Sequence, residues 1–177
     1  MISKNVAVTA GHCVYQSGHN GWATSIKVSP GKKGTGFWNN PYGSANCTNM
    51  HTSTRWTGEG GAGSDWGVIE LDKDIGEKTG WFGLGYSSES VAGTRYTITG
   101  YPAGYQYHQY TMSGIITNCD NNMLYYQIDT TGGQSGSPIY SNNIVYGIHV
   151  NGENSNNENS GTRITQSLYN YMISVIE

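Results

Sequence analysis

Short apolar runs bounded by turn residues dominate the chain. Runs that are rich in β-branched and aromatic residues predict strands over residues 5–10, 23–29, 66–71, 94–102, 110–117, 123–130 and 143–150. The alternation is clearest between Thr94 and Thr99, where Tyr96 and Ile98 share one face of the strand. Many short strands with frequent turns predict an antiparallel sandwich or barrel.

One segment has helical periodicity instead. Near the C-terminus the apolar positions recur at intervals of three and four, at Ile164, Leu168, Tyr171, Met172, Val175 and Ile176. This stripe predicts one amphipathic helix over about residues 163–176, with Thr162 or Thr165 at its start. The polar segments 31–63 and 152–161 are expected to be loops, and the second is expected to be a flexible surface loop.

Composition narrows the class of protein. The 177 residues suffice for one large β domain or two small barrels. Only 12% of the residues are charged, the net charge is −3 and no basic patch stands out, which argues against nucleic acid as a partner. No apolar run approaches the roughly 20 residues of a membrane span. The first residues, MISKNVAVTAGHC, do not have the pattern of a signal peptide.

The cysteine count is odd, so at least one of Cys13, Cys47 and Cys119 lacks an intrachain disulfide partner. A pairing of Cys47 with Cys119 is one open possibility. His12 and Cys13 together with another cysteine would offer zinc ligands, but no C-x-x-C or H-E-x-x-H pattern is present. We therefore expect neither a metal site nor a cofactor.

The segment TTGGQSGSP, residues 130–138, offers a candidate nucleophile. Its glycines either form a simple turn or hold Ser135 in an exposed position. Consecutive N–H groups near Gly133 and Ser135 could converge on one point, as an oxyanion hole requires. The loop by itself leaves both interpretations open.

A nucleophilic serine needs a histidine base, usually oriented by a carboxylate. Two histidines lie in apolar strands: His12 in TAGHCV at a strand end, and His149 in YGIHV after the serine loop. Asp65, in SDWGVIEL, directly precedes a predicted strand. The remaining candidates are expected to be surface histidines, solvated carboxylates or a local turn residue: His19, His51, His108, Asp72, Asp74 and Asp129.

The segments TAGHCV, SDWGVIEL and GGQSGSP resemble, in this order, the His, Asp and Ser motifs of trypsin-like serine proteases. TTGGQSGSP, GYP after TITG, YTMSG and IVYGIHV are closest to the bacterial glutamyl endopeptidases. The resemblance covers the chain from about Asn5 to its end. It implies an all-β fold of chymotrypsin type, with two six-stranded antiparallel barrels and a C-terminal helix. The expected domains are residues 1–86 and residues 87–177.

The same resemblance implies the roles of individual residues. His12 would be the general base, Asp65 would orient it, and Ser135 would attack the scissile carbonyl. The N–H groups of Gly133 and Ser135 would bind the oxyanion. A secreted endopeptidase that acts on peptides or proteins is the expected function, with glutamate preferred over aspartate before the cut.

Specificity is expected to come from two side chains. Protonated His149 and the Thr130 hydroxyl would bind the substrate carboxylate, because a buried carboxylate needs hydrogen-bond donors. Backbone of Val150, Asn151 and Gly152 would pair with the substrate as an added strand.

The family fold has about two strands before the strand that delivers the histidine, so we expect a first barrel that lacks part of its wall. Open strand edges would then favour association, although the oligomeric state is not predicted. Two further interpretations stay open at this point: an inactive protease homologue, and a surface- or carbohydrate-binding β module suggested by the Tyr, Trp, Gly and Asn content.

Overall fold

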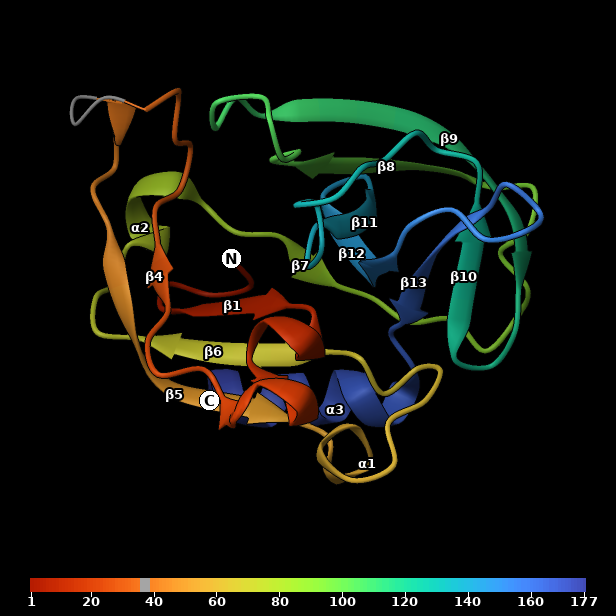
Figure 1. The fold of residues 1–177 in the computed structure, drawn as a ribbon, viewed down its shortest axis with the longest axis horizontal. Coiled ribbons are helices and arrows are strands. Elements are labelled where there is room, and N and C mark those ends of the chain that lie inside the picture. The colour runs from red at the N-terminus through yellow and green to blue at the C-terminus, as the bar shows by residue number, and fades with distance from the viewer. Residues whose placement is uncertain (36–38) are drawn as a thin grey trace.

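A computed structural model describes residues 1–35 and 39–177. Figure 1 shows two β assemblies side by side, with a C-terminal helix packed against them. The strands are β1 (Val6–Thr9), β2 (Tyr15–Gln16), β3 (Gly21–Trp22), β4 (Lys27–Val28), β5 (Ala45–Thr52), β6 (Gly67–Leu71), β7 (Gly83–Leu84), β8 (Arg95–Gly100), β9 (Tyr110–Cys119), β10 (Met123–Tyr126), β11 (Pro138–Ser141), β12 (Ile144–Asn151) and β13 (Asn159–Arg163). The helices are α1 (Thr54–Thr57), α2 (Gly76–Thr79) and α3 (Gln166–Ile176), and 3-10 turns form η1 (Gly11–Cys13) and η2 (Ser17–His19).

The first assembly is an open antiparallel sheet in the order β1-β6-β5-β4. β1 pairs with β6 alone and β4 with β5 alone, so this half-barrel has two free edges within the described residues. Its own apolar core consists of Ala7, Val14, Ala45, Ile69, Leu71 and Ile75. We call this assembly the open sheet; association through its edges stays a prediction.

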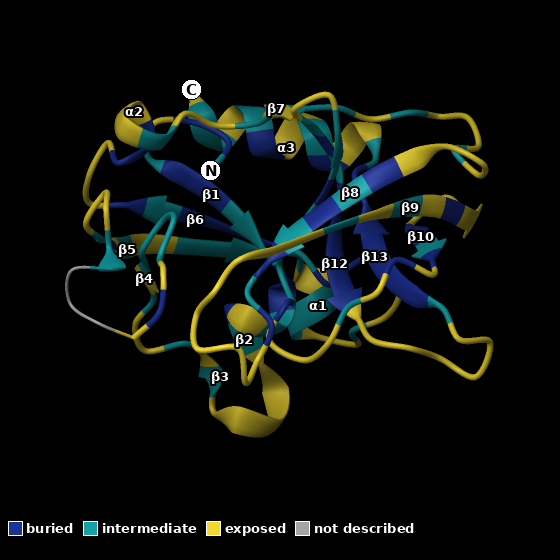
Figure 2. Ribbon diagram, turned by 90° about the horizontal axis from the view of Figure 1, so that it is seen from above, coloured by how far each residue is buried: buried dark blue, intermediate teal, exposed yellow. Residues whose placement is uncertain are grey.

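The second assembly closes on itself. Six strands follow the order β11-β8-β9-β10-β13-β12, and β11 pairs with β12 to complete the ring, while β7 adds to β12 in parallel. We call it the closed barrel. Its core contains Tyr96, Ile98, Ile116, Leu124, Tyr126, Ile128 and Ile139, and Figure 2 shows β12 and β13 as mostly buried.

A third core cluster joins the two assemblies. Val6 and Val68 of the open sheet pack with Ile148 of the closed barrel and with Leu168 and Met172 of α3. Burying side chains of this size stabilises a fold by about 1.5–3 kcal/mol each. The junction is therefore an apolar interface, and elements from both assemblies hold the groups that lie along it.

The predicted helix exists but begins later than its apolar stripe suggested. α3 starts at Gln166, and the Thr165 hydroxyl caps it by accepting the N–H of Leu168 at 3.2 Å. Ile164 lies before the helix and is fully buried in the junction core, where it packs instead of extending the helical face. Thr162 belongs to β13 and does not cap the helix.

Both predicted loops were wrong in part. The segment 31–63 contains β5 and α1, and the segment 152–161 ends inside β13, whose residues are all buried; residues 36–38 lie outside the described chain. All three cysteines carry free thiols, so Cys47 and Cys119 do not form a disulfide here. Within the described chain, no helix has the length and apolarity needed to cross a membrane.

Candidate active site

The register between β1 and β6 brings His12 and Asp65 together. The two strands are antiparallel, and Thr9 at the end of β1 lies opposite Gly67 at the start of β6. His12 follows β1 in the η1 turn, and Asp65 precedes β6, so both residues leave the open sheet at the same end. The paired strand ends thus bring into contact two side chains that are 53 residues apart in sequence.

Asp65 holds both the ring and the backbone of His12. Nδ1 of the imidazole lies 2.8 Å from Oδ2 of Asp65, and the backbone N–H donates to Oδ1 at 2.9 Å. Because a carboxylate accepts only, Nδ1 carries the proton and Nε2 is left as the basic nitrogen. The hydrogen bond that Nδ1–H of His12 donates to Asp65 raises the pKa of His12 above its ordinary value of 6.5, against an opposing effect of partial burial.

Close packing fixes the position of Asp65. A Cβ at Gly11 would lie 3.0 Å from Asp65 Oδ1 and 2.9 Å from the backbone nitrogen of Trp66, so a larger residue would displace the carboxylate from His12. The backbone carbonyl of Asp65 accepts a hydrogen bond of 2.8 Å from the hydroxyl of Thr162, on β13 of the closed barrel. Asp65 is thus held from both assemblies.

The serine loop is tied to β12 by backbone hydrogen bonds. The N–H of Gly136 donates to the carbonyl of His149 at 2.8 Å, and the N–H of His149 donates to the carbonyl of Ser137 at 2.9 Å. The loop also packs against the end of β1, because a Cβ at Gly136 would lie 3.0 Å from the backbone nitrogen of Ala10. Ser135 therefore lies close to the junction from which His12 emerges.

The N–H groups of Gly133 and Ser135 have no acceptor among the described residues. Gly133 has a φ of +91°, in the region that favours glycine, and a Cβ there would lie 2.7 Å from the backbone nitrogen of Ala103. Between the two free N–H groups, the buried side chain of Gln134 braces the loop by accepting the N–H of Thr131 at 2.8 Å. This arrangement leaves two backbone donors available to a bound oxyanion.

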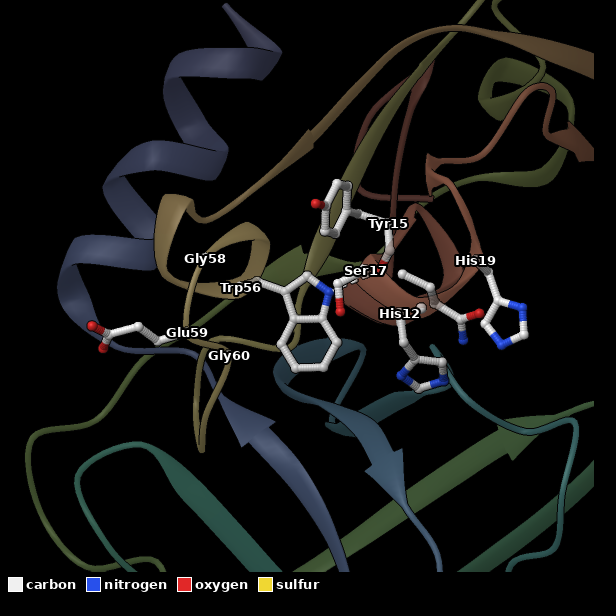
Figure 3. Close-up of a pocket in the computed structure, with 10 residues that line it drawn as sticks. His12, Tyr15, Ser17, His19, Trp56, Gly58, Glu59 and Gly60 are labelled. Atoms are coloured by element: carbon white, nitrogen blue, oxygen red, sulfur yellow. Dashed lines mark hydrogen bonds between the residues drawn. The ribbon is translucent and has the colours of Figure 1, made fainter.

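Two hollows flank these groups. A groove of about 780 Å³ runs along the junction, and its lining includes Gly133, Ser135 and Val8. His12 lines a smaller hollow of about 380 Å³ with Trp56, shown in Figure 3. In the described part of the chain, His12 and Ser135 do not form a hydrogen bond with each other. Such catalytic bonds often shorten only when substrate is bound.

His149 lies inside the closed barrel with 3% of its surface exposed. Its Nδ1 lies 2.6 Å from the hydroxyl of Tyr126. Burial, and to a lesser degree the charge of His12, lowers the pKa of His149 from 6.5 to about 4. His149 is therefore neutral near pH 7 in the free protein; the expected protonated form concerns the complex with a substrate carboxylate and stays a prediction.

The other expected specificity residues lie around it. Thr130 Oγ1 is buried and has no partner in the described chain, although buried hydroxyls generally have one. Val150 is buried at a shift in the register of β12 against β13, while Asn151 and Gly152 are exposed. The unpaired Thr130 hydroxyl is thus available to a bound group.

A sequence model of one family, described as "Trypsin", matches residues 1–173. The chain belongs to the trypsin family.

Relatives and solved structures agree with this assignment. A glutamyl endopeptidase of Bacillus licheniformis is 37% identical and aligns with 96% of this chain and 56% of its own length. A Bacillus subtilis protein named extracellular metalloprotease is 34% identical over 96% of this chain and 55% of its own length. A structure of Glu endopeptidase in complex with MPD has a TM-score of 0.92 at 29% identity, covering 99% of this chain and 83% of that one. The expected chymotrypsin-type fold, with an incomplete first barrel, is confirmed, and the chain spans about half the length of these curated relatives.

The other histidines and aspartates form no hydrogen bond with His12, Asp65 or Ser135 in the described chain. His51 is not a free surface histidine: its Nε2 lies 2.8 Å from Glu70, and its Nδ1 lies 3.0 Å from the hydroxyl of Tyr171. His19, His108, Asp72 and Asp74 are exposed, as expected, and Asp129 is exposed but does not lie in a turn. In the described residues, no group of three or more His, Cys, Asp or Glu side chains is placed to hold a metal ion.

Two contacts of this trypsin-family site were not expected from the sequence, those of Thr162 and Tyr126. Thr162 lies 97 residues from Asp65, and no local pattern connects them. The position of Tyr126 could have been predicted, because it is two residues from Leu124 and from Ile128 and so shares their core-facing side of the strand. A tyrosine on a core face needs a partner for its hydroxyl.

Proposed function

We propose that this chain is the catalytic part of a serine endopeptidase that cleaves peptides and proteins after glutamate, and less readily after aspartate. One observation carries the proposal. Asp65 fixes His12 with Nε2 unprotonated, beside a serine loop that keeps two backbone N–H groups free. A base, an orienting carboxylate, a nucleophile and an oxyanion hole are the parts that acyl transfer requires.

In the proposed reaction, Ser135 Oγ attacks the scissile carbonyl while His12 Nε2 takes its proton. The carbonyl oxygen becomes an oxyanion held by the N–H groups of Gly133 and Ser135, which stabilise charge that is absent from the ground state. His12 then gives the proton to the leaving amine, and an acyl-enzyme remains on Ser135. Water, deprotonated by His12, releases the acid product and restores Ser135.

Thr130 and His149 are proposed to bind the glutamate side chain. The unpaired hydroxyl of Thr130 and a ring nitrogen of His149 can each donate to a carboxylate oxygen. The exposed backbone of Asn151 and Gly152 would add the peptide as a strand.

The names of relatives support this assignment. The Bacillus licheniformis relative is named a glutamyl endopeptidase; the Bacillus subtilis relative is named an extracellular metalloprotease, and only the word extracellular in that name bears on the proposal. Action outside the cell on peptide or protein substrates therefore goes with the proposal.

The test uses peptides that differ only at the residue before the cut. The expected order of kcat/KM is Glu, then Asp, with Lys, Phe and Ala far behind. Equal cleavage after Lys, Phe or Ala would contradict the glutamate preference. Ser135→Ala should abolish both turnover and labelling by a fluorophosphonate probe, whereas Ser137→Ala should keep the label. Labelling that survives Ser135→Ala would exclude Ser135 as the nucleophile.

A further inference from the structure

The interior of the closed barrel carries a row of polar side chains on one face. Tyr126 on β10 lies opposite Asn159 on β13, and Gly161 on β13 lies opposite His149 on β12. Directly paired residues share a face of a sheet, and so do residues two apart along a strand. Tyr126, Asn159 and His149 therefore point to the same side. The hydroxyl of Tyr126 reaches diagonally across β13 and lies 2.6 Å from Nδ1 of His149.

The direction of this hydrogen bond follows from the available partners. In the described chain, the hydroxyl of Tyr126 contacts no acceptor other than His149 Nδ1. If Nδ1 carried the proton, the O–H of Tyr126 would be a buried donor without an acceptor, which costs about 1–3 kcal/mol. Burial also raises the pKa of Tyr126 well above 10, so the hydroxyl keeps its proton. The hydroxyl therefore donates to Nδ1, and the single proton of neutral His149 lies on Nε2.

We propose that Tyr126 is a positioning residue for substrate selection: its hydroxyl fixes neutral His149 in the Nε2–H form, so that this N–H is the donor offered to the glutamate carboxylate. The inference rests on the proposed function, and it names a residue through which specificity is set without any contact with substrate. A neutral imidazole offers one N–H, so a wrong tautomer would present a lone pair to the carboxylate and repel it.

Tyr126→Phe keeps the ring and removes the hydroxyl. Both tautomers of His149 then become accessible, and the variant should cleave after glutamate about tenfold less efficiently, mainly through a higher KM. Cleavage after alanine, which has no side-chain acceptor, should change little, so the Glu/Ala ratio of kcat/KM should fall. Tyr96→Phe is the matched control, because Tyr96 is buried in the same core and its hydroxyl makes no hydrogen bond in the described chain.

A second measurement reads the tautomer directly. Nitrogen-15 NMR of histidine-labelled protein, with the His149 signals assigned through His149→Gln, should show a protonated Nε2 and an unprotonated Nδ1 near pH 7. Tyr126→Phe should shift these signals toward a mixture, and Tyr96→Phe should not. A wild-type signal from the Nδ1–H form, or a Glu/Ala ratio that is equal in Tyr126→Phe and wild type, would overturn the inference.

The two levels of the proposal fail differently. A wild-type chain that cleaves after alanine as well as after glutamate would refute the glutamate preference whatever the tautomer. A wild-type chain that prefers glutamate but carries the proton on Nδ1 would leave the proposed function intact and remove Tyr126 from it. Should Tyr126→Phe fail to fold, the wild-type NMR spectrum still decides the tautomer.

Discussion

The open sheet and the closed barrel hold their share of the proposed machinery in different ways. The closed barrel ties its serine loop to β12 through backbone hydrogen bonds of its own, and it buries His149 in its own interior. The open sheet supplies His12 and Asp65 from loops at strand ends, and one of the bonds that hold Asp65 comes from Thr162, across the junction. The closed barrel thus holds its groups mainly through its own hydrogen bonds, whereas the open sheet holds Asp65 partly through a bond from its neighbour.

The largest expected effect concerns the open sheet. Asp65→Asn replaces the carboxylate that fixes the tautomer of His12, so the ring would no longer be held with Nε2 as the basic nitrogen. We expect kcat to fall by about four decades, as in the template Ser-His-Asp triad. The hydrogen bond that His12 donates to Asp65 raises the pKa of His12, and His12 must be unprotonated to act as a base. The acid limb of kcat/KM should therefore lie above pH 6.5 in the wild type and move to lower pH in the variant.

Asp72→Asn is the matched control for this change. Asp72 follows the other end of β6, is exposed, and contacts Asn46 instead of a histidine. Asp72→Asn also removes one negative charge beside β6, so kcat and the acid limb of kcat/KM should stay near the wild-type values. A loss in Asp72→Asn similar to that in Asp65→Asn would mean that net charge, and not the His12 contact, accounts for the effect.

Hydrophobic alternation predicted the strands whose faces differ in polarity and missed those whose faces do not. In β8 the inward residues Tyr96 and Ile98 are buried, as their alternation indicated. β5 has the sequence ANCTNMHT and β13 has NSGTR, both without an apolar stripe. β13 pairs with β10 at one edge and with β12 at the other, so it lies inside the sheet of the closed barrel. This position comes from long-range pairing, which a local pattern does not contain.

The candidate site divides in the same way. The local sequence predicted that His12 and Asp65 lie beside strands, and the antiparallel register of β1 with β6 explains why they meet. The protonation state of His149 could not be predicted from the local sequence, because its low pKa results from burial in a closed barrel. Its contact with Tyr126 depends on the order and the register of three strands, β10, β13 and β12.

The interior of the closed barrel should make stability depend on pH. His149 has a folded pKa of about 4 and an unfolded value of 6.5, so the unfolded chain takes up its proton first as the pH falls. The contribution of neutral His149 to the free energy of unfolding is complete above pH 6.5. It is lost between pH 6.5 and 4, and this loss is about 3 kcal/mol. His12 has the opposite sense: its raised pKa adds stability that is present below pH 6.5 and lost as the pH rises through the folded value.

Urea unfolding at several pH values between 7 and 4 measures this slope. His149→Gln should have a flatter profile than the wild type over this range, because the group that titrates differently in the two states is gone. His19→Gln, at an exposed position, should keep the wild-type slope. Parallel profiles for wild type and His149→Gln would show that His149 is not held neutral by the barrel.

The smallest expected effect lies at the junction, and it tests whether the open sheet depends on the closed barrel. Thr162→Val keeps the shape of a fully buried side chain but removes the only donor from the closed barrel to the Asp65 carbonyl among the described contacts. Leaving that carbonyl unpaired should lower the free energy of unfolding by about 1–3 kcal/mol. Because Asp65 then loses one of its supports, kcat should fall by about tenfold while KM changes little. Thr162→Ser keeps the hydroxyl and should recover the rate even where it does not recover all of the stability. Stability lost in both variants with kcat unchanged would show that the open sheet holds Asp65 in place without help from the closed barrel.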